Sequence, residues 1–221
     1  MKILLISPTL EGIGGVAQHT RDLVKFLQES NHNVDIISSE NIPTIPIKKL
    51  KNPSFLLSSF IKTKFMKHYD IVHAQHPIAA LAMKNITGKK ILTIHGIYSN
   101  QIEMLHGKLG TTFSNKYEKN ALTWADAITA GSMEAFNHYK KSNSNVFFIP
   151  NGIDVLEFSK IVNAKHLLFE KYNFTNDTKL IGFPSWFDQE FSGGFESLAR
   201  SFIGRINIDH DLLAMSTTNC F

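Results

Sequence analysis

Residues 6–23 read ISPTLEGIGGVAQHTRDL, and this stretch connects a short apolar strand to a glycine-rich turn and a helix. The turn contains Gly12, Gly14 and Gly15, and the helix begins near Val16. Glycines in such a turn let backbone N–H groups approach a ligand closely, and the dipole of the following helix favours negative charge. The stretch therefore predicts an anion-binding turn or, alternatively, a turn whose glycines only permit tight packing.

The alternation of strand and helix continues along most of the chain. Strands are predicted at residues 2–7, 33–39, 69–75, 89–96, 126–132 and 145–154, and helices at 16–30, 53–68, 77–85, 110–125 and 133–141. The strands are too apolar to leave one face in water, which is typical of a parallel sheet covered by helices on both faces. We therefore predict an α/β fold with a doubly wound, Rossmann-like parallel sheet.

Composition narrows the function classes. The 221 residues carry a net charge of +4, which is too small to indicate nucleic-acid binding. The single cysteine, Cys220, rules out a disulfide framework and favours a reducing, cytoplasmic location. No apolar run approaches the roughly 18 residues of a membrane span.

The lysines are unevenly distributed. Six of them fall in one stretch with no acidic residue between them, at Lys48, Lys49, Lys51, Lys62, Lys64 and Lys67. Phe55, Leu56, Phe60 and Phe65 alternate with the last three of these lysines. A basic amphipathic helix of this kind suits the cytoplasmic face of a membrane. The alternative is a surface helix that packs its apolar side on the sheet.

Histidines follow two of the predicted strands. His95 lies where open α/β sheets bind ligands, at the carboxyl end of strand 89–96, and could donate a hydrogen bond to a sugar hydroxyl or phosphate. His73 and His76 form an H-x-x-H motif. Because a metal would need more ligands and this spacing at a strand end does not place both rings on one face, no metal is predicted. One of the two could contact a sugar or phosphate, although a surface position is favoured.

A dinucleotide site is a weaker alternative for the glycine turn. Gly12, Gly14 and Ala17 match the G-x-G-x-x-A fingerprint, and Glu40 at the end of the second strand could bind a ribose. In that fingerprint the first glycine follows the strand directly, whereas Pro8 and three further residues intervene here. Residues 147–158, FFIPNGIDVLEF, form another specific stretch, in which Pro150 stops a strand and a turn follows.

Five segments, in order, resemble the N-terminal half of glycosyltransferase family 4, the retaining group with the two-domain glycosyltransferase-B fold. They are residues 2–37, 70–83 (DIVHAQHPIAALAM), 90–98 (KILTIHGIY), 125–132 (ADAITAGS) and 147–158. The resemblance covers about residues 1–160. It implies an acceptor-binding N-terminal domain, a C-terminal domain for a nucleotide-diphospho-sugar, and hexosyl transfer to a saccharide or lipid-linked acceptor in polysaccharide or glycolipid biosynthesis.

The resemblance also implies roles for individual residues. His95 would contact the transferred sugar as a catalytic residue, and Gly14, Gly15 and His73 would contact phosphate or sugar. Asn151, Gly152 and Asp154 would form the interdomain hinge. The family needs no obligatory metal and no cofactor. The implied domains are residues 1–155 (acceptor domain), 156–177 (linker and helix), 178–203 (start of the donor domain) and 204–221 (a tail without family resemblance or clear period).

The second half departs from the family pattern. Trp186 stands where an arginine is expected, no lysine lies between Trp186 and Phe195, and the paired glutamates with seven residues between them are missing. These cations would hold the diphosphate, and tryptophan cannot replace a guanidinium. We therefore expect a truncated glycosyltransferase that is weak or inactive alone. The alternatives are a non-catalytic glycan- or partner-binding remnant and, less favoured, a dinucleotide-binding oxidoreductase.

Overall fold

A computed structural model of the chain describes residues 1–12, 14–47, 50–98, 115–152, 162–175, 180–182 and 213–215. The chain divides into two compact units, Met1–Asp154 and Val155–Phe221, and each is described by itself. The residues for which the resemblance implies a ligand role, His95, His73, Gly14 and Gly15, all belong to the first unit.

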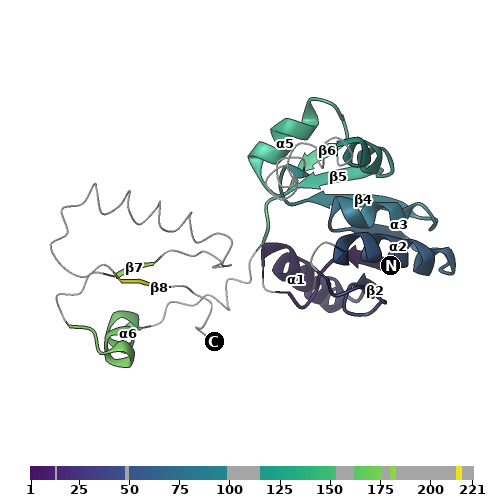
Figure 1. Ribbon diagram of the computed structural model, residues 1–221. Helices are drawn as coiled ribbons and strands as arrows, with labels where there is room; N and C mark the ends of the chain where they lie inside the picture. Colours follow the sequence, from purple (N-terminus) through teal and green to yellow (C-terminus); the bar gives the residue numbers. More distant parts are fainter. Residues whose placement is uncertain are drawn as a thin grey trace. The chain divides into compact units, whose positions relative to one another are not determined.

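A parallel sheet of six strands forms the centre of the first unit (Figure 1). Its strands lie in the order β2-β1-β3-β4-β5-β6 and all five pairings are parallel. The strands are β1 (Lys2–Ser7), β2 (Asn33–Ser38), β3 (Ile71–Ala74), β4 (Lys89–Ile94), β5 (Ala127–Ala130) and β6 (Val146–Phe148). The predicted doubly wound α/β fold is confirmed. The order reverses at β1, so the switch point, where such sheets bind ligands, lies between β1 and β3.

The helices connect successive strands. They are α1 (Gly15–Glu29), α2 (Lys51–Lys64), the 3₁₀ turn η1 (Pro77–Ala79), α3 (Ala80–Met83) and α5 (Met133–Lys140), and residues 115–123 are also helical. Because parallel crossovers are right-handed, the reversal at β1 puts α1 on one face of the sheet and α2 on the other. The helix predicted at 77–85 is divided into η1 and α3. Helix α2 begins two residues before Pro53, since a proline is tolerated in the first turn.

The core is made by the strands and the inner helix faces. In β1 the side chains from Ile3 to Ile6 are buried, and Val72, Leu92 and Ile128 continue the core across the next three strands. This explains the near-continuous apolar runs. Residues alternate between apolar and polar only in a strand with one face in solvent, and these strands are covered by helices on both faces. Phe55 of α2 is fully buried against this core.

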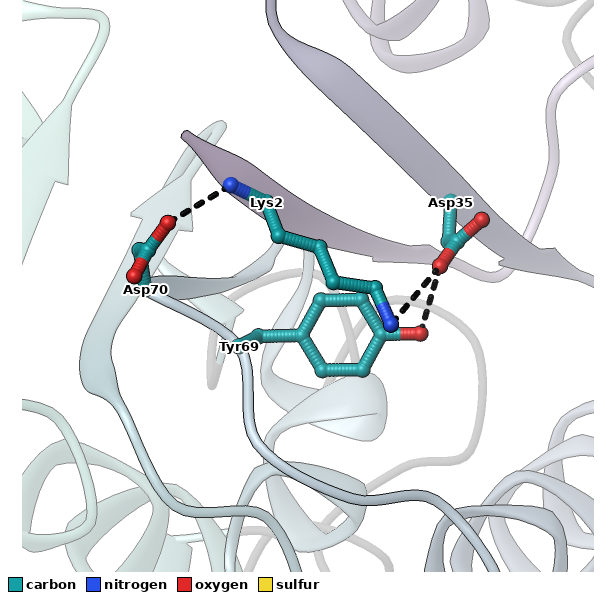
Figure 2. A network of polar contacts seen from close by, with 4 residues as sticks. All are labelled: Lys2, Asp35, Tyr69 and Asp70. Carbon is teal, nitrogen blue, oxygen red and sulfur yellow. Dashed lines mark hydrogen bonds and ion pairs between the residues drawn. The ribbon is translucent and has the colours of Figure 1, made fainter.

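A polar network closes the amino-terminal edge of the sheet (Figure 2). The backbone N of Lys2 donates to Asp70 Oδ2 at 2.7 Å, and the Tyr69 hydroxyl donates to Asp35 Oδ2 at 2.6 Å. Lys2 Nζ lies 3.8 Å from the same Asp35 oxygen and 4.3 Å from the centre of the Tyr69 ring. Burial and the Asp35 carboxylate raise the pKa of Tyr69, so it stays a neutral donor. This network joins the starts of β1, β2 and β3 and lies away from the ligand edge.

The second unit contains α6 (Ala164–Tyr172), β7 (Leu180–Gly182) and β8 (Leu213–Met215). Helix α6 lies within residues 156–177, where a linker and a helix are expected. Strand β8 pairs in parallel with β7. A run of three apolar residues is too short to show a period in sequence. Asp154, Trp186 and the paired-glutamate region lie outside the described residues. The division of 156–221 into linker, donor-domain start and tail stays a prediction.

Candidate functional site

The loop after β1 is fixed by side chains from three elements. The Ser7 hydroxyl donates to the Thr9 carbonyl at 2.7 Å, and the Gly12 amide donates to Thr9 Oγ1 at 3.2 Å. From α1, Arg21 Nη1 donates to the carbonyls of Leu10 at 2.6 Å and Gly12 at 3.1 Å. A Cβ atom on Gly12 would lie 2.5 Å from Thr9 Oγ1, so only glycine fits at this position without displacing Thr9. Residues 9–12 of the loop are thus bonded to both β1 and α1.

Glu40, at the end of β2, secures the same loop from the other side. Its carboxylate accepts from the Leu10 amide at 3.2 Å and from the Thr9 hydroxyl at 3.3 Å. Desolvation raises the pKa of this carboxyl, but hydrogen bonds, first of all from Ser38, outweigh it, so the pKa is lowered and the group is ionised. In the structure this carboxylate therefore serves the loop, and the alternative in which Glu40 binds a ribose stays a prediction.

Gly14 and Gly15 open α1 and are exposed. Gly14 is the N-cap residue, no side chain caps the first turn, and the space where a Cβ would stand is open at both glycines. The first N–H groups of a helix have no intrahelical partner, and the helix dipole makes this end favourable for negative charge. The anion-binding role of this turn stays a prediction.

Histidines from three elements gather near this turn. His95 follows β4, His19 comes from the second turn of α1, and their ring centroids lie 5.1 Å apart, edge to face. Burial lowers the pKa of His95 to about 4, with His19 adding to the effect, whereas a hydrogen bond to the backbone of Gln75 opposes it. Burial also lowers the pKa of His19. Both rings are therefore neutral near pH 7 and add no positive charge to the site.

One ring nitrogen of His95 is left without a partner. Its Nε2 is buried and, among the residues that the structure describes, has no hydrogen-bond partner. A neutral imidazole carries one donor and one acceptor nitrogen, and its tautomer decides which of the two Nε2 is. A buried polar atom without a partner is costly unless a ligand or water completes it.

His95 also lines a small hollow. The hollow has a volume of about 50 Å³ and is lined by Val16, His76, Pro77, Ile94, His95, Gly96 and Tyr98. That space holds a hydroxyl or hydroxymethyl group rather than a whole sugar ring. The ring of Tyr98 packs edge to face on His76 at 5.2 Å, and its backbone N donates to the Tyr139 hydroxyl at 3.1 Å. The wall of the hollow is thereby fixed to α5.

His73 and His76 are half-buried rather than fully exposed. His73 Nε2 lies 2.7 Å from Thr93 Oγ1, which in turn lies 2.8 Å from Thr129 Oγ1, so a polar chain crosses three strands. Gln75 Nε2 lies 3.2 Å from the same His73 nitrogen. Burial lowers the pKa of His73 to about 3 and that of His76 to about 4. A direct contact of His73 with a ligand stays a prediction.

Sequence reasoning missed His19, Gln75 and Tyr98. Gln75 follows β3 directly, so it could have been found by asking which polar residues adjoin a strand end. His19 lies four residues after Gly15, so it could have been found by asking which polar residues lie in the first two turns of the helix after the glycines. In the described part of the chain, no group of three or more His, Cys, Asp or Glu side chains could hold a metal ion.

The sequence profile described as Glycosyltransferase Family 4 matches residues 13–156, which is more than half of the chain. The chain belongs to glycosyltransferase family 4. A comparison with curated protein sequences finds no match.

Solved structures share the fold of this family member. Anabaena Alr3699/HepE in complex with UDP-glucose has a TM-score of 0.58 and 13% identity, over 98% of this chain and 69% of that chain. Its complex with UDP has a TM-score of 0.59 and 12% identity over the same shares. An alpha-glucosyltransferase in complex with UDP and a 13-mer DNA has a TM-score of 0.50 and 11% identity, over 98% and 66%. At such identities the likeness concerns the fold, a glycosyltransferase-B fold.

Two other predicted regions of this glycosyltransferase lie apart from the histidines. Asn151 and Gly152 are exposed, and Asn151 Oδ1 is 3.0 Å from the position a Cβ would take on Gly131, after β5. Their role as a hinge stays a prediction, and Asp154 lies outside the described residues. Lys62, Lys64 and Lys67 are exposed near the end of α2, which leads to the start of β3 and so to the opposite edge. Within the described residues, no helix is long and apolar enough to span a bilayer.

Proposed function

We propose that this family 4 glycosyltransferase binds a nucleotide-diphospho-sugar, with UDP-glucose as the first donor to test, and acts in retaining hexosyl transfer to a saccharide or lipid-linked acceptor. The observation that carries the proposal is His95, which lines the hollow at the carboxyl edge of the sheet and whose buried Nε2 has no partner among the described residues. The HepE structures contain UDP-glucose or UDP, which supports a uridine nucleotide as donor.

The roles of the residues follow from their protonation and placement. His95 forms a hydrogen bond with a sugar hydroxyl through Nε2, which has no other partner among the described residues. The exposed amides of Gly14 and Gly15 bind phosphate or sugar, His73 supports the same edge, and Asn151 to Asp154 connect to the donor half. The protein supplies these groups without a metal or cofactor.

The departing diphosphate needs positive charge, because charge develops on it in the transition state. The four histidines near the turn are neutral, and the family's arginine position holds Trp186. We therefore propose slow or absent turnover by this chain alone. This same lack of cations favours a second candidate, a glycan-binding function without catalysis. A lipid-linked acceptor would also need contact with a membrane surface, for which Lys62, Lys64 and Lys67 are the predicted residues.

The test combines calorimetry with an assay of UDP release, using the full chain. We expect measurable binding of UDP-glucose or of a sugar that is lost in His95→Ala. The matched control is His68→Ala, since His68 is an exposed histidine near the opposite edge of the same sheet. Binding of a sugar without UDP release would favour the glycan-binding alternative. Binding unaffected by His95→Ala would remove the site assignment.

A further inference from the structure

A buried carboxyl group is joined through Tyr139 to the wall of the hollow that His95 lines. Glu118, on the helix at 115–123, is only 5% exposed. It accepts a hydrogen bond from the hydroxyl of Tyr139 on α5, which is 2% exposed. A buried carboxyl lowers stability unless it is well paired, and an apolar residue of similar size would serve packing at least as well. The position of Glu118 therefore needs an explanation other than stability.

The hydrogen bonds of Tyr139 have a fixed direction. A backbone N–H can only donate, so the Tyr139 oxygen accepts from the Tyr98 amide at 3.1 Å and donates its own proton to Glu118. Burial, followed by the bond to Glu118, raises the pKa of Tyr139, so the hydroxyl keeps this proton. The three residues are thereby joined in the order Tyr98, Tyr139, Glu118.

Glu118 also acts on Tyr98 directly. Burial raises the pKa of the Glu118 carboxyl, whereas the bond from Tyr139, the nearby His138 and a bond to the backbone of Tyr98 lower it in part. The amide of Tyr98 is therefore held by two buried side chains, one from α5 and one from the helix at 115–123. Because Tyr98 comes four residues after the end of β4, these contacts and not the ladder of the sheet hold its amide.

The Tyr98 ring forms part of the wall of the hollow. It packs edge to face on His76, with the ring centroids 5.2 Å apart. The helix at 115–123 holds a second part of the lining, because the Tyr117 hydroxyl donates to the Ile78 carbonyl at 3.3 Å, next to Pro77. A hollow of about 50 Å³ is close in size to one hydroxymethyl group, so a small displacement of its wall decides what fits.

We propose that Glu118 and Tyr139 are positioning residues that make the hollow select a hexose with a hydroxymethyl group over a pentose without one. They hold Tyr98 against His76, so that the hydroxymethyl group fills the hollow that His95 also lines. A sugar without this group leaves the hollow unfilled and loses the contacts of its lining. This inference rests on the proposed function, since it requires a sugar to bind at the carboxyl edge of the sheet.

The experiment compares the binding of UDP-glucose with that of UDP-xylose, which lacks only the hydroxymethyl group, by calorimetry on the full chain. We expect the unaltered chain to prefer UDP-glucose by about tenfold or more. Tyr139→Phe and Glu118→Met should largely abolish this preference by weakening the binding of UDP-glucose, because Tyr98 is no longer held. Glu118→Gln retains an oxygen that accepts from Tyr139, so it should keep most of the preference.

Tyr69→Phe is the matched control. Tyr69 is also a buried tyrosine, 3% exposed, and its hydroxyl donates to the Asp35 carboxylate at 2.6 Å, but it lies at the amino-terminal edge of the sheet (Figure 2). This variant should lose stability as Tyr139→Phe does and yet keep the preference for UDP-glucose. A merely structural role of Tyr139 would instead weaken the binding of both ligands equally. Circular dichroism checks that each variant is folded.

The outcomes separate this inference from the proposed function. Equal binding of the two ligands by the unaltered chain, a preference unchanged in Tyr139→Phe and Glu118→Met, or an equal loss in Tyr69→Phe would overturn the inference alone. If the unaltered chain binds neither ligand, the proposed function fails, and the NMR chemical shifts of the His76 ring protons become the readout. Shifts that move in Tyr139→Phe but not in Tyr69→Phe would support the positioning of the Tyr98 ring, and unchanged shifts would overturn it.

Discussion

Replacing Arg21 by Met tests whether the glycine loop is held from α1. The change removes the bonds from Nη1 to the carbonyls of Leu10 at 2.6 Å and Gly12 at 3.1 Å, and the bond from Nη2 to Gln18 Oε1 at 2.6 Å. The methionine retains the apolar stem, so packing is largely preserved.

The magnitude follows from the exposure of the loop. A hydrogen bond to a charged group contributes about 1.5–3 kcal/mol when its partner would otherwise stay unsatisfied. Arg21 is half-exposed and the exposed Gln18 can be rehydrated, so we expect a total loss of about 2 kcal/mol. For a chain of about this size that corresponds to a fall in Tm of about 4–8 °C.

Thermal unfolding and amide hydrogen exchange provide the assay. The amides of Leu10 and Gly12 should exchange faster in Arg21→Met, and ligand binding at Gly14 should weaken. Lys116→Met, at an exposed position on the helix at 115–123, is the control and should leave both measurements unchanged. An unchanged Tm together with unchanged exchange in the loop would refute the reasoning, since it would mean that Arg21 holds nothing.

Three other predictions concern the core and the histidines. Burial lowers the pKa of His73 to about 3 and those of His76 and His95 to about 4, whereas a histidine of the unfolded chain has a pKa of about 6.5. Below about pH 6.5 the unfolded chain therefore binds more protons than the folded chain, and the free energy of unfolding should fall from about pH 7 to about pH 5. A Tm that is constant over that interval would contradict it. Phe55→Ala should cost about 3–5 kcal/mol in urea unfolding, because its side chain is fully buried, and a loss under about 1 kcal/mol would contradict its core position. Tyr139→Phe removes the hydroxyl that binds Glu118 and the Tyr98 amide, and should lower the free energy of unfolding by about 1–3 kcal/mol. Hydrogen exchange of the Tyr98 amide should become faster, and unchanged exchange would contradict these bonds.

The strands and helices of the sheet could be predicted from the sequence because each is marked by neighbouring residues in the chain. Each strand is an apolar run of a few residues, and each connecting segment shows a helical period or a turn residue. A strand covered on both faces must be apolar throughout, so runs such as Ile3 to Ile6 already indicate a parallel sheet. The carboxyl-edge position of His95 follows in the same way, because every parallel strand of the sheet ends at one edge.

The partners of these residues depended on tertiary contacts. His19 and His95 are far apart in sequence, and their rings meet because α1 begins beside the end of β4. Glu40 accepts a hydrogen bond from the amide of Leu10, thirty residues before it in the chain. The protonation of His73 likewise depends on burial, which composition does not encode. Helix α2 shows the limit most clearly: its apolar residues occur around the helix, so periodicity could not say whether Phe55 or Phe65 faces the core. In the structure Phe55 packs into the core and Phe65 is exposed, and Asn85, in the turn after α3, bonds to Phe60 and Thr63 of α2. Only such contacts between distant segments rank one helix face above the other.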